Sequence, residues 1–433
     1  MPVSGAPVAV VGAGWAGLAA AVALVQAGRQ VTLFEMASVP GGRARQVQTA
    51  QGEFDNGQHI LIGAYTQTLK LMRQVGADPS RLLLRQPLAL RYPDGGGLAL
   101  PPGPALPAFV RAVLAARAWR LADKLALLAA AASWLARGFD CPGHLTVQAL
   151  CRALPARVRE ELVDPLCVAA LNTPASSASA RVFLRVLKDA LFAGPGSADL
   201  LLPRVGLSAL LPDPAMQWLQ AAGARIETRH RVQQLAAPAP GQAGWSVDGQ
   251  GFHGVVLACS AVEAARLVAP HQARWAQRAS QLRYEAIVTA YLRDADLHLP
   301  QAMVALRAQG QAPAQFVFDL AALGREPAGF AWVVSGAGQH LVQGLAGCGQ
   351  RVLAQARQVF PGAFRGEADQ VIRHLAAERR ATLACLPDLD RPGTGIAPGL
   401  VAAGDYIAGP YPSTLEGAVR SGQAAVQALL ACA

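Results

Sequence analysis

Three glycines and one carboxylate near the N-terminus have the types and the spacing of a loop that cradles phosphate. Gly12, Gly14 and Gly17 form a G-x-G-x-x-G. The first glycine permits a tight turn, the second lets a pyrophosphate approach the backbone, and the third lets a helix pack closely on a strand. Glu35 follows after about 20 residues, where a carboxylate accepts hydrogen bonds from ribose hydroxyls and disfavours a 2′-phosphate. These residues predict a dinucleotide site.

The segments around these residues have the order that such a site needs. Val8 to Val11 is a short apolar strand, Trp15 to Ala27 a helix rich in Ala, Leu and Val, and Val31 to Phe34 a second strand. Gly28 is placed to end the helix in a left-handed cap. Trp15 and Ala16 open the helix, whose free N–H groups and positive dipole end attract phosphate. The alternative is a plain βαβ unit rich in Ala and Gly.

A second glycine pair distinguishes between the dinucleotides. Gly41, Gly42 and Arg43 follow the second strand, and they could bring backbone and guanidinium onto the same pyrophosphate. The segment resembles the second motif of the flavoprotein family that includes amine oxidases, protoporphyrinogen oxidase and the carotenoid desaturases. That resemblance implies FAD rather than NAD. The alternative is an ordinary Gly-Gly turn with a solvated arginine.

Two further peptides narrow the resemblance. Asp55-Asn56-Gly57-Gln58-His59, followed by Ile60 to Tyr65, looks like the hydroxysqualene dehydroxylase family of hopanoid synthesis. In relatives of the desaturase type this glycine segment passes beside the flavin ring, which implies cofactor contacts for Gly57, Gln58 and His59. The peptide around Asn172 and Thr173 also matches that family and implies substrate contacts at a helix end turned toward a cavity. The alternatives are a hairpin turn, a buried core histidine and a capping turn.

The C-terminal segment completes the resemblance. A strand ends in Gly404-Asp405, and a last helix opens near Thr414. In FAD proteins of this group the Gly-Asp end contacts the ribityl–phosphate region, and the helix N-terminus faces the pyrimidine side of the flavin. The residues implied there are Thr414, Leu415, Gly417 and Ala418. On a strand predicted over 225–235, Val232 is the matching candidate for a backbone contact to adenine.

These motifs imply an α/β fold of the amine oxidase or phytoene desaturase type. We expect a discontinuous, Rossmann-like FAD-binding domain over 1–100, 191–265 and 391–433. An inserted substrate-binding domain of mixed sheet and helices would take 101–190 and 266–390. The prolines at 101, 102, 104 and 107 mark the first boundary. No second G-x-G-x-x-G for a nicotinamide cofactor is evident.

Composition bounds the compartment and the partners. The chain has 433 residues, of which 52% are hydrophobic and 15% charged, and seven scattered cysteines without a C-x-x-C. Free thiols favour a reducing compartment, and the N-terminus has no features of a signal peptide. The net charge of +10 comes nearly all from arginine. It favours an anionic membrane surface over nucleic acid, because no module of alternating aromatic and basic residues is visible.

Residues 108–137 form a long helical pattern that could lie in a membrane interface. Leu114, Leu121, Leu125 and Leu128 share one predicted face, and basic residues at 117, 120 and 124 share another. The alternative is one or two ordinary helices of the substrate domain. With the resemblance, this pattern implies a cytoplasmic enzyme, peripheral on the inner membrane, with a hydrophobic C30 isoprenoid substrate and a hydroxysqualene synthase as partner.

The implied reaction is reductive dehydroxylation of hydroxysqualene to squalene. A general acid would protonate the leaving hydroxyl, an apolar pocket would exclude water from the allylic cation, and reduced FAD would deliver hydride. Asp55 and His59 are the titratable residues nearest the expected flavin ring and are our catalytic candidates. Asp164 is a weaker candidate.

Two rival functions stay open. One is a desaturase that oxidises a carotenoid or squalene-type precursor, because one fold serves both directions. The other is a non-catalytic, FAD-stabilised protein that binds isoprenoids. An amine oxidase is less favoured, since no convincing aromatic pair flanks the flavin, although Tyr406 and Tyr411 are near in sequence.

Overall fold

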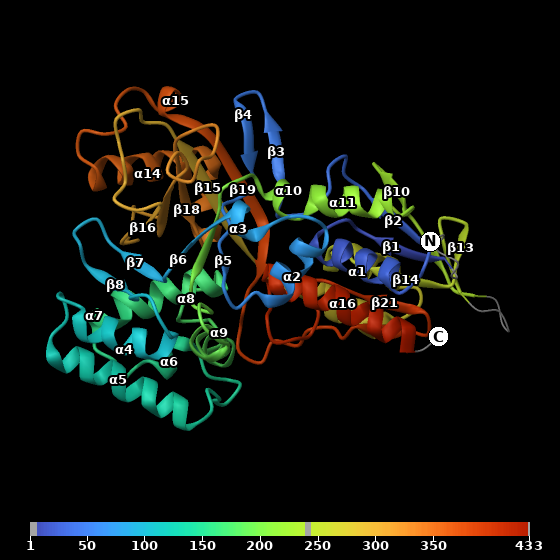
Figure 1. Cartoon of the computed structure of the whole chain (residues 1–433), viewed down its shortest axis with the longest axis horizontal. Coiled ribbons are helices and arrows are strands. Elements are labelled where there is room, and N and C mark those ends of the chain that lie inside the picture. Colours follow the sequence, from blue (N-terminus) through green and yellow to red (C-terminus); the bar gives the residue numbers. More distant parts are fainter. Residues whose placement is uncertain (1–6, 239–243, 432–433) are drawn as a thin grey trace.

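The computed structural model describes residues 7–238 and 244–431, and it is built around a six-stranded sheet (Figure 1). The strand order is β10-β2-β1-β14-β21-β20, with parallel pairing except between β20 and β21. Side chains of β1 and β2 are buried throughout, as expected for a parallel sheet covered on both faces. The strands are β1 (Val8–Val11), β2 (Val31–Glu35), β10 (Arg225–Thr228), β14 (Gly254–Leu257), β20 (Gly395–Ala397) and β21 (Leu400–Ala402).

Helices from both ends of the chain cover one face of this sheet. The first and last long helices, α1 (Trp15–Gln26) and α16 (Leu415–Ala431), lie side by side in Figure 1. They approach closely at Gly422, where a Cβ atom would fall 2.2 Å from the carbonyl oxygen of Ala16. The other face packs against α12 (Ala261–Val268), α13 (Ala273–Ser280) and a small sheet of β11 (Leu235–Ala236), β12 (Trp245–Val247) and β13 (Gln250–Phe252).

A second, antiparallel sheet has the order β16-β17-β18-β15-β19. One of its faces packs under α14 (Gly344–Val359). Residues of the opposite face, including Phe316 and Phe318, line the main cavity of the molecule. The strands are β15 (Tyr284–Leu292), β16 (Met303–Ala305), β17 (Phe316–Asp319), β18 (Phe330–Val334) and β19 (Ile372–Leu383).

Helices gather in a third region, at the lower left of Figure 1. Its elements are α4 (Ala105–Ala115), α5 (Leu121–Ala136), α6 (Val147–Leu150), α7 (Ala156–Val158), a π-helical turn (Arg159–Val163), α8 (Asp164–Leu171) and α9 (Ala180–Phe192). The remaining elements are short. They are α2 (Thr66–Gln74), α3 (Pro79–Leu82), α10 (Leu207–Leu210), α11 (Pro212–Ala221), α15 (Ala368–Val371), a 3₁₀ turn (Ala337–Leu341), β3 (Gln46–Thr49), β4 (Gly52–Asp55), β5 (Leu61–Ile62), β6 (Leu83–Gln86), β7 (Ala89–Arg91), β8 (Gly97–Ala99) and β9 (Leu200–Pro203).

The structure has an α/β fold of the predicted type, with two local differences. The helical pattern at 108–137 is interrupted after Ala115, because Trp119 is buried and donates a hydrogen bond to Glu161 Oε2 at 2.9 Å. The strand predicted over 225–235 ends at Thr228, since Arg229 takes a positive φ of 57°. The expected division into two domains remains a proposal.

Candidate functional site

The glycine loop has the close packing that its spacing predicts. Gly12 has a φ of +106°, which favours glycine, and a Cβ on Gly17 would fall 1.8 Å from the Gly12 carbonyl oxygen. A Cβ on Gly14 would meet nothing nearer than 3.9 Å, because this residue faces open space. Gly17 therefore seats α1 on β1, whereas Gly14, Trp15 and Ala16 line the cavity itself.

Glu35 lies at the end of β2 and is 7% exposed. Its Oε2 accepts a hydrogen bond from Ala13 N at 2.7 Å, and its Oε1 accepts one from Ala37 N at 2.8 Å. The carboxylate lines the cavity while it holds the glycine loop in place. The ribose contact predicted for Glu35 remains a prediction.

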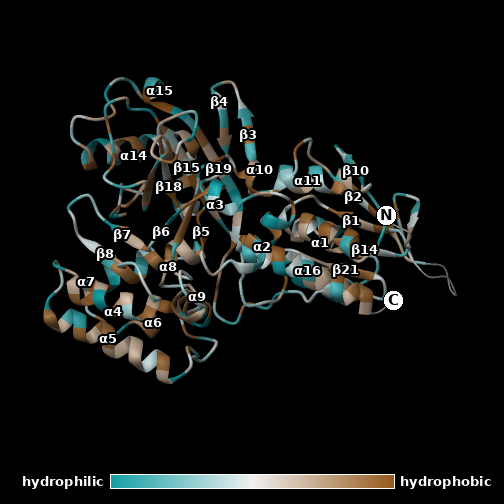
Figure 2. Ribbon diagram, in the orientation of Figure 1, coloured by the Kyte–Doolittle hydropathy of each residue, from teal (hydrophilic) through white to brown (hydrophobic). Residues whose placement is uncertain are grey.

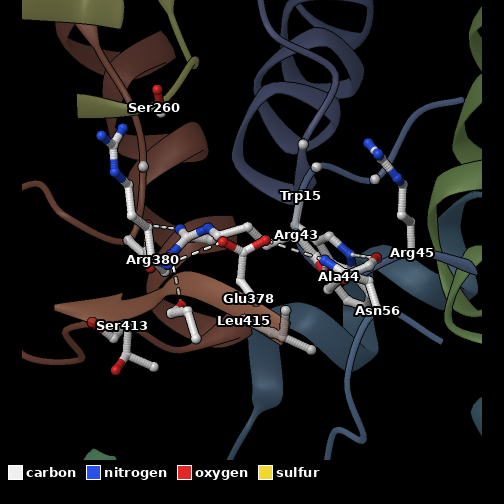
Figure 3. Close-up of a pocket in the computed structure, with 18 of the residues that line it drawn as sticks. Trp15, Arg43, Ala44, Arg45, Asn56, Ser260, Glu378, Arg380, Ser413 and Leu415 are labelled. Carbon is white, nitrogen blue, oxygen red and sulfur yellow. Dashed lines mark hydrogen bonds and ion pairs between the residues drawn. The ribbon is translucent and has the colours of Figure 1, made fainter. Parts of the chain in front are cut away.

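Arg43 lines the cavity and is held by partners within the fold. The pyrophosphate contact predicted for Arg43 remains a prediction. Its Nη2 lies 2.5 Å from Asp405 Oδ1, and its Nη1 donates to the carbonyl oxygens of Ala381 at 2.7 Å and Arg380 at 3.2 Å (Figure 3). Burial lowers the pKa of Arg43, but the adjacent Asp405 carboxylate outweighs it and raises the pKa overall. The guanidinium thus ties the loop of Gly41 and Gly42 to the C-terminal motif.

Asp55 lies behind the cavity wall rather than in it. Its Oδ2 is 2.7 Å from Arg325 Nη1, its Oδ1 accepts a hydrogen bond from Leu207 N at 2.9 Å, and the residue is 1% exposed. Burial raises the pKa of Asp55, and Arg325 opposes the rise. The expectation that Asp55 reaches a substrate is not met by this placement, because its carboxylate is enclosed in an ion pair away from the lining residues.

His59 does line the cavity, together with Gly57 and Gln58. Its Nδ1 lies 2.9 Å from the Gly57 carbonyl oxygen, and since a carbonyl only accepts, Nδ1 carries the proton. Burial lowers the pKa of His59, which favours the neutral ring. A neutral ring of this tautomer offers an unprotonated Nε2. His59 is therefore arranged to accept a proton or hydrogen bond at neutral pH rather than to donate one.

Most residues of the C-terminal motif lie at the cavity. The flavin contacts implied for them remain predictions. Gly404, Asp405, Thr414, Leu415 and Ala418 line the cavity. Thr414 Oγ1 accepts a hydrogen bond from Gly417 N at 2.9 Å, which caps the first turn of α16. A Cβ on Gly417 would fall 2.0 Å from Tyr411 O, so Gly417 serves packing and is not among the lining residues.

Val232 is brought to the cavity by an irregular segment, not by a strand. It is 3% exposed, and its carbonyl oxygen accepts a hydrogen bond from Arg266 Nη2 at 2.6 Å. The adenine contact predicted for Val232 stays a prediction.

Asn172 and Thr173 have separate roles. Asn172 ends α8 in a left-handed conformation with a φ of 48° and lines the cavity. Its Nδ2 donates to Thr382 Oγ1 at 2.9 Å, and its Oδ1 accepts from Gly336 N at 2.7 Å. Thr173 is fully buried outside the lining, where its Oγ1 accepts a hydrogen bond from Cys385 N at 3.0 Å. The substrate contact expected of Thr173 is therefore not supported, because the side chain is used within the fold.

One continuous cavity of about 630 Å³ joins these motifs. Such a volume is typical of a site for a cofactor or small ligand. One part is lined by the glycine loops, Glu35 and the C-terminal motif. Other lining residues are apolar, and they include Ile60, Val168, Ile287, Phe316, Phe318, Val333 and Ala376.

A distortion of β19 supplies functional residues that the sequence did not single out. Ile287 pairs with Glu378 and Glu285 with Thr382, so three residues of β19 lie opposite one residue of β15. Such bulges redirect side chains and are common beside active sites. Glu378 and Arg380 both line the cavity from this segment. The guanidinium of Arg380 has no ion pair among the residues that the structure describes.

A match over most of the chain shows the family to which this protein belongs. The model of the family described as flavin containing amine oxidoreductase matches residues 15–430, and the chain belongs to that family. Its cofactor is FAD. The positive φ angles of Gly12 and Gly42, the open space at Gly14 and the N-terminus of α1 fit a dinucleotide pyrophosphate. The individual FAD contacts remain predictions.

Particular relatives refine the comparison. The chain is 28% identical to hydroxysqualene dehydroxylase of Sinorhizobium fredii, over 97% of both chains. It is 31% identical to the dehydroxylase of Zymomonas mobilis over 240 residues, which are 52% of this chain and 54% of that protein. A zeta-carotene desaturase of Synechocystis is 30% identical over 53% of this chain and 50% of its own. The fold resembles an oxidoreductase structure from Methanosarcina mazei with a TM-score of 0.74 and 16% identity, covering 97% of this chain and all of that one.

Proposed function

We propose that this FAD-dependent oxidoreductase reductively dehydroxylates hydroxysqualene to squalene. The observation that carries the proposal is the set of apolar side chains that line the cavity, together with a relative of that name aligned over 97% of both chains. A C30 hydrocarbon chain needs long apolar walls, and Ile287, Phe316 and Phe318 supply them.

The residues of the chain have defined tasks in this reaction. Gly12, Gly14 and the N-terminus of α1 would hold the pyrophosphate of FAD, and α16 would face the flavin. Bound and reduced, FAD supplies the hydride. The apolar walls bury the allylic centre and exclude the water that would recapture an allylic cation. Asn172 fixes the wall by joining Thr382 to Gly336.

A desaturase is the second candidate function. The match to a zeta-carotene desaturase at 30% identity favours it, but that match covers only half of each chain. Desaturation would run in the opposite direction, with oxidised FAD taking hydride from the substrate. The apolar walls of the cavity would suit either polyisoprenoid.

We further propose that the helical region docks on an anionic membrane surface. Among the residues that the structure describes, five of the nine exposed large apolar side chains lie on α4, α5 and α9, and α5 is largely apolar along its length in Figure 2. They are Leu114, Leu121, Leu125, Leu135 and Phe192. Exposed arginines at 111, 117, 120 and 137 accompany this patch, and their charge complements anionic headgroups. No helix among the described residues is long and apolar enough to cross a membrane.

Product analysis distinguishes the two catalytic functions. Purified holoenzyme would be incubated with hydroxysqualene under a chemical reductant, and separately with zeta-carotene in the presence of a quinone. Mass spectrometry of the extracts would identify the products. Squalene from the first incubation alone supports the dehydroxylase, and a more unsaturated carotenoid from the second alone would overturn it.

A further inference from the structure

Loss of a hydroxyl group as water needs a proton donor, and four carboxyl groups line the cavity among the residues that the structure describes. They belong to Glu35, Glu263, Glu378 and Asp405. Asp55 is not one of them, and His59 in its neutral tautomer presents a lone pair rather than a proton. Tyr65, Tyr284 and Tyr406 also line the cavity, but burial raises the pKa of each phenol and makes it a weaker acid. We therefore compare the four carboxyl groups.

Three of the four are committed to other partners. Glu35 accepts hydrogen bonds from Ala13 N of the glycine loop at 2.7 Å and from Ala37 N at 2.8 Å. Asp405 is paired with Arg43 at 2.5 Å. Glu263 is paired with Arg231 at 2.8 Å and with Arg266 at 3.0 Å. Protonating either of these last two would break an ion pair, and protonating Glu35 would loosen the glycine loop.

Glu378 has only neutral hydrogen-bond donors. Its Oε1 accepts from Arg380 N at 3.0 Å, and its Oε2 accepts from Asn56 Nδ2 at 3.3 Å. No cationic group among the described residues lies within 4.0 Å of this carboxylate. Figure 3 shows Glu378, a lining residue of the cavity, between Arg43 and Asn56. The Glu378 carboxylate contributes to the raised pKa of Arg43 from beyond ion-pair distance. Glu378 therefore differs from the other three carboxyl groups in having neither an ion pair nor a hydrogen bond to the glycine loop.

The position of Glu378 relates it to the apolar walls. Ala376, two residues before Glu378 on the same strand face, lines the cavity. Ile287, which pairs with Glu378 from β15, also lines it. The bulge that follows Glu378 presents the carbonyl oxygens of Arg380 and Ala381 to Arg43. The same distortion thus anchors Arg43 and directly follows a carboxyl group that lines the cavity.

We propose that Glu378 is the general acid that protonates the leaving hydroxyl group, with Asn56 as its positioning residue. The O–H bond of the Glu378 carboxyl breaks, its proton joins the hydroxyl oxygen of the substrate, and the allylic C–O bond breaks to release water. FAD, when bound and reduced, would supply the hydride whose electron pair the carbon needs. Glu378 is left as carboxylate and is reprotonated from solvent. This inference rests on the proposed dehydroxylase function.

The test compares Glu378→Gln with a matched control, Glu285→Gln. Glu285 lies on the adjacent strand, is half-buried and does not line the cavity. Single turnover of hydroxysqualene by the reduced holoenzyme, expressed per bound flavin, should fall about 10²- to 10⁴-fold in Glu378→Gln. It should stay within about threefold of the parent in Glu285→Gln. A Glu378→Gln rate within about threefold of the parent overturns the proposal.

A second substrate separates acid catalysis from a structural effect. In a fluoroacetate ester of hydroxysqualene, the leaving group is the fluoroacetate anion. This anion is a stable carboxylate and has little need of a proton to leave. The defect of Glu378→Gln should shrink at least about tenfold with this ester. An equal defect with both substrates overturns the proposal, and so does a variant that fails only because it loses FAD. If the parent enzyme converts neither substrate, the proposed function itself fails. If the parent enzyme converts both substrates and Glu378→Gln does so equally fast, only the role of Glu378 fails.

Discussion

Arg325 Nη1 lies 2.7 Å from Asp55 Oδ2, and the two side chains are 5% and 0% exposed. Arg325 Nη1 also lies 3.5 Å from Gln58 Oε1, so one buried cation contacts both ends of the Asp55–Gln58 segment. The backbone carbonyl of Asp55 accepts a further hydrogen bond from Tyr291 at 2.9 Å. This buried ion pair fixes the peptide that passes along the cavity, and it explains why Asp55 is unsuited to exchange protons with a substrate.

Replacing Asp55 by Asn should destabilise the fold rather than the chemistry alone. The change leaves the buried charge of Arg325 uncompensated, which costs about 3–5 kcal/mol. Urea unfolding of the apoprotein would measure the loss, with Glu53→Gln on the exposed part of β4 as control. A loss below about 1 kcal/mol, combined with abolished turnover, would return Asp55 to the list of catalytic candidates.

Two alanine substitutions in the glycine loop should separate folding from cofactor binding. Gly14→Ala places its Cβ in open cavity space at a φ of −72°, so stability should change little while FAD affinity falls at least about tenfold. Gly17→Ala forces a contact of 1.8 Å with Gly12 O, so both stability and affinity should fall. Thermal unfolding of the apoprotein and titration with FAD would measure the two effects. Unchanged FAD affinity in Gly14→Ala would contradict the assignment of the loop.

Acid should weaken the fold through His59. Burial lowers its pKa below the ordinary value near 6.5, so the unfolded chain binds more protons than the native state as pH falls through that value. Stability from this group is therefore present above about pH 6.5 and is lost progressively below it. Urea unfolding between about pH 5 and 8 should show a shallower acid loss in His59→Gln than in the parent. Parallel curves would contradict the prediction.

Anionic vesicles should retain the protein through the patch on α4, α5 and α9. Leu121→Asp with Leu125→Asp adds two negative charges to exposed positions and should reduce co-sedimentation with phosphatidylglycerol vesicles about tenfold or more. Val342→Asp, at a position 84% exposed but outside the patch, is the control. Equal losses in the double variant and the control would remove the proposed membrane surface.

Local patterns predict the nucleotide-binding part of this fold well. The strands and helix around Gly12 and Gly17 are defined by contacts between neighbouring residues, and their observed bounds agree with the sequence to within one residue. The partners of the site depend instead on distant segments. Arg43 contacts carbonyl oxygens more than 300 residues away, and Asp55 is enclosed by Arg325 from the loop between β17 and β18.

Glu378 and Arg380 reach the cavity through a strand irregularity that no local pattern indicates. The interruption of the helical pattern at 108–137 has a similar origin. Trp119 is buried and donates a hydrogen bond to Glu161, which is 42 residues later in the chain. An amphipathic periodicity does not encode that contact.

An anaerobic single-turnover experiment would test whether the reduced flavin of this protein dehydroxylates hydroxysqualene. The holoenzyme would be reduced, freed of excess reductant and mixed with hydroxysqualene, with flavin absorbance followed in time and the product quantified after quenching. We expect the flavin to be reoxidised, with one squalene formed per flavin. A reduced flavin that persists with hydroxysqualene, while the oxidised enzyme is bleached by a carotenoid precursor such as phytoene, would contradict it and assign the chain as a desaturase.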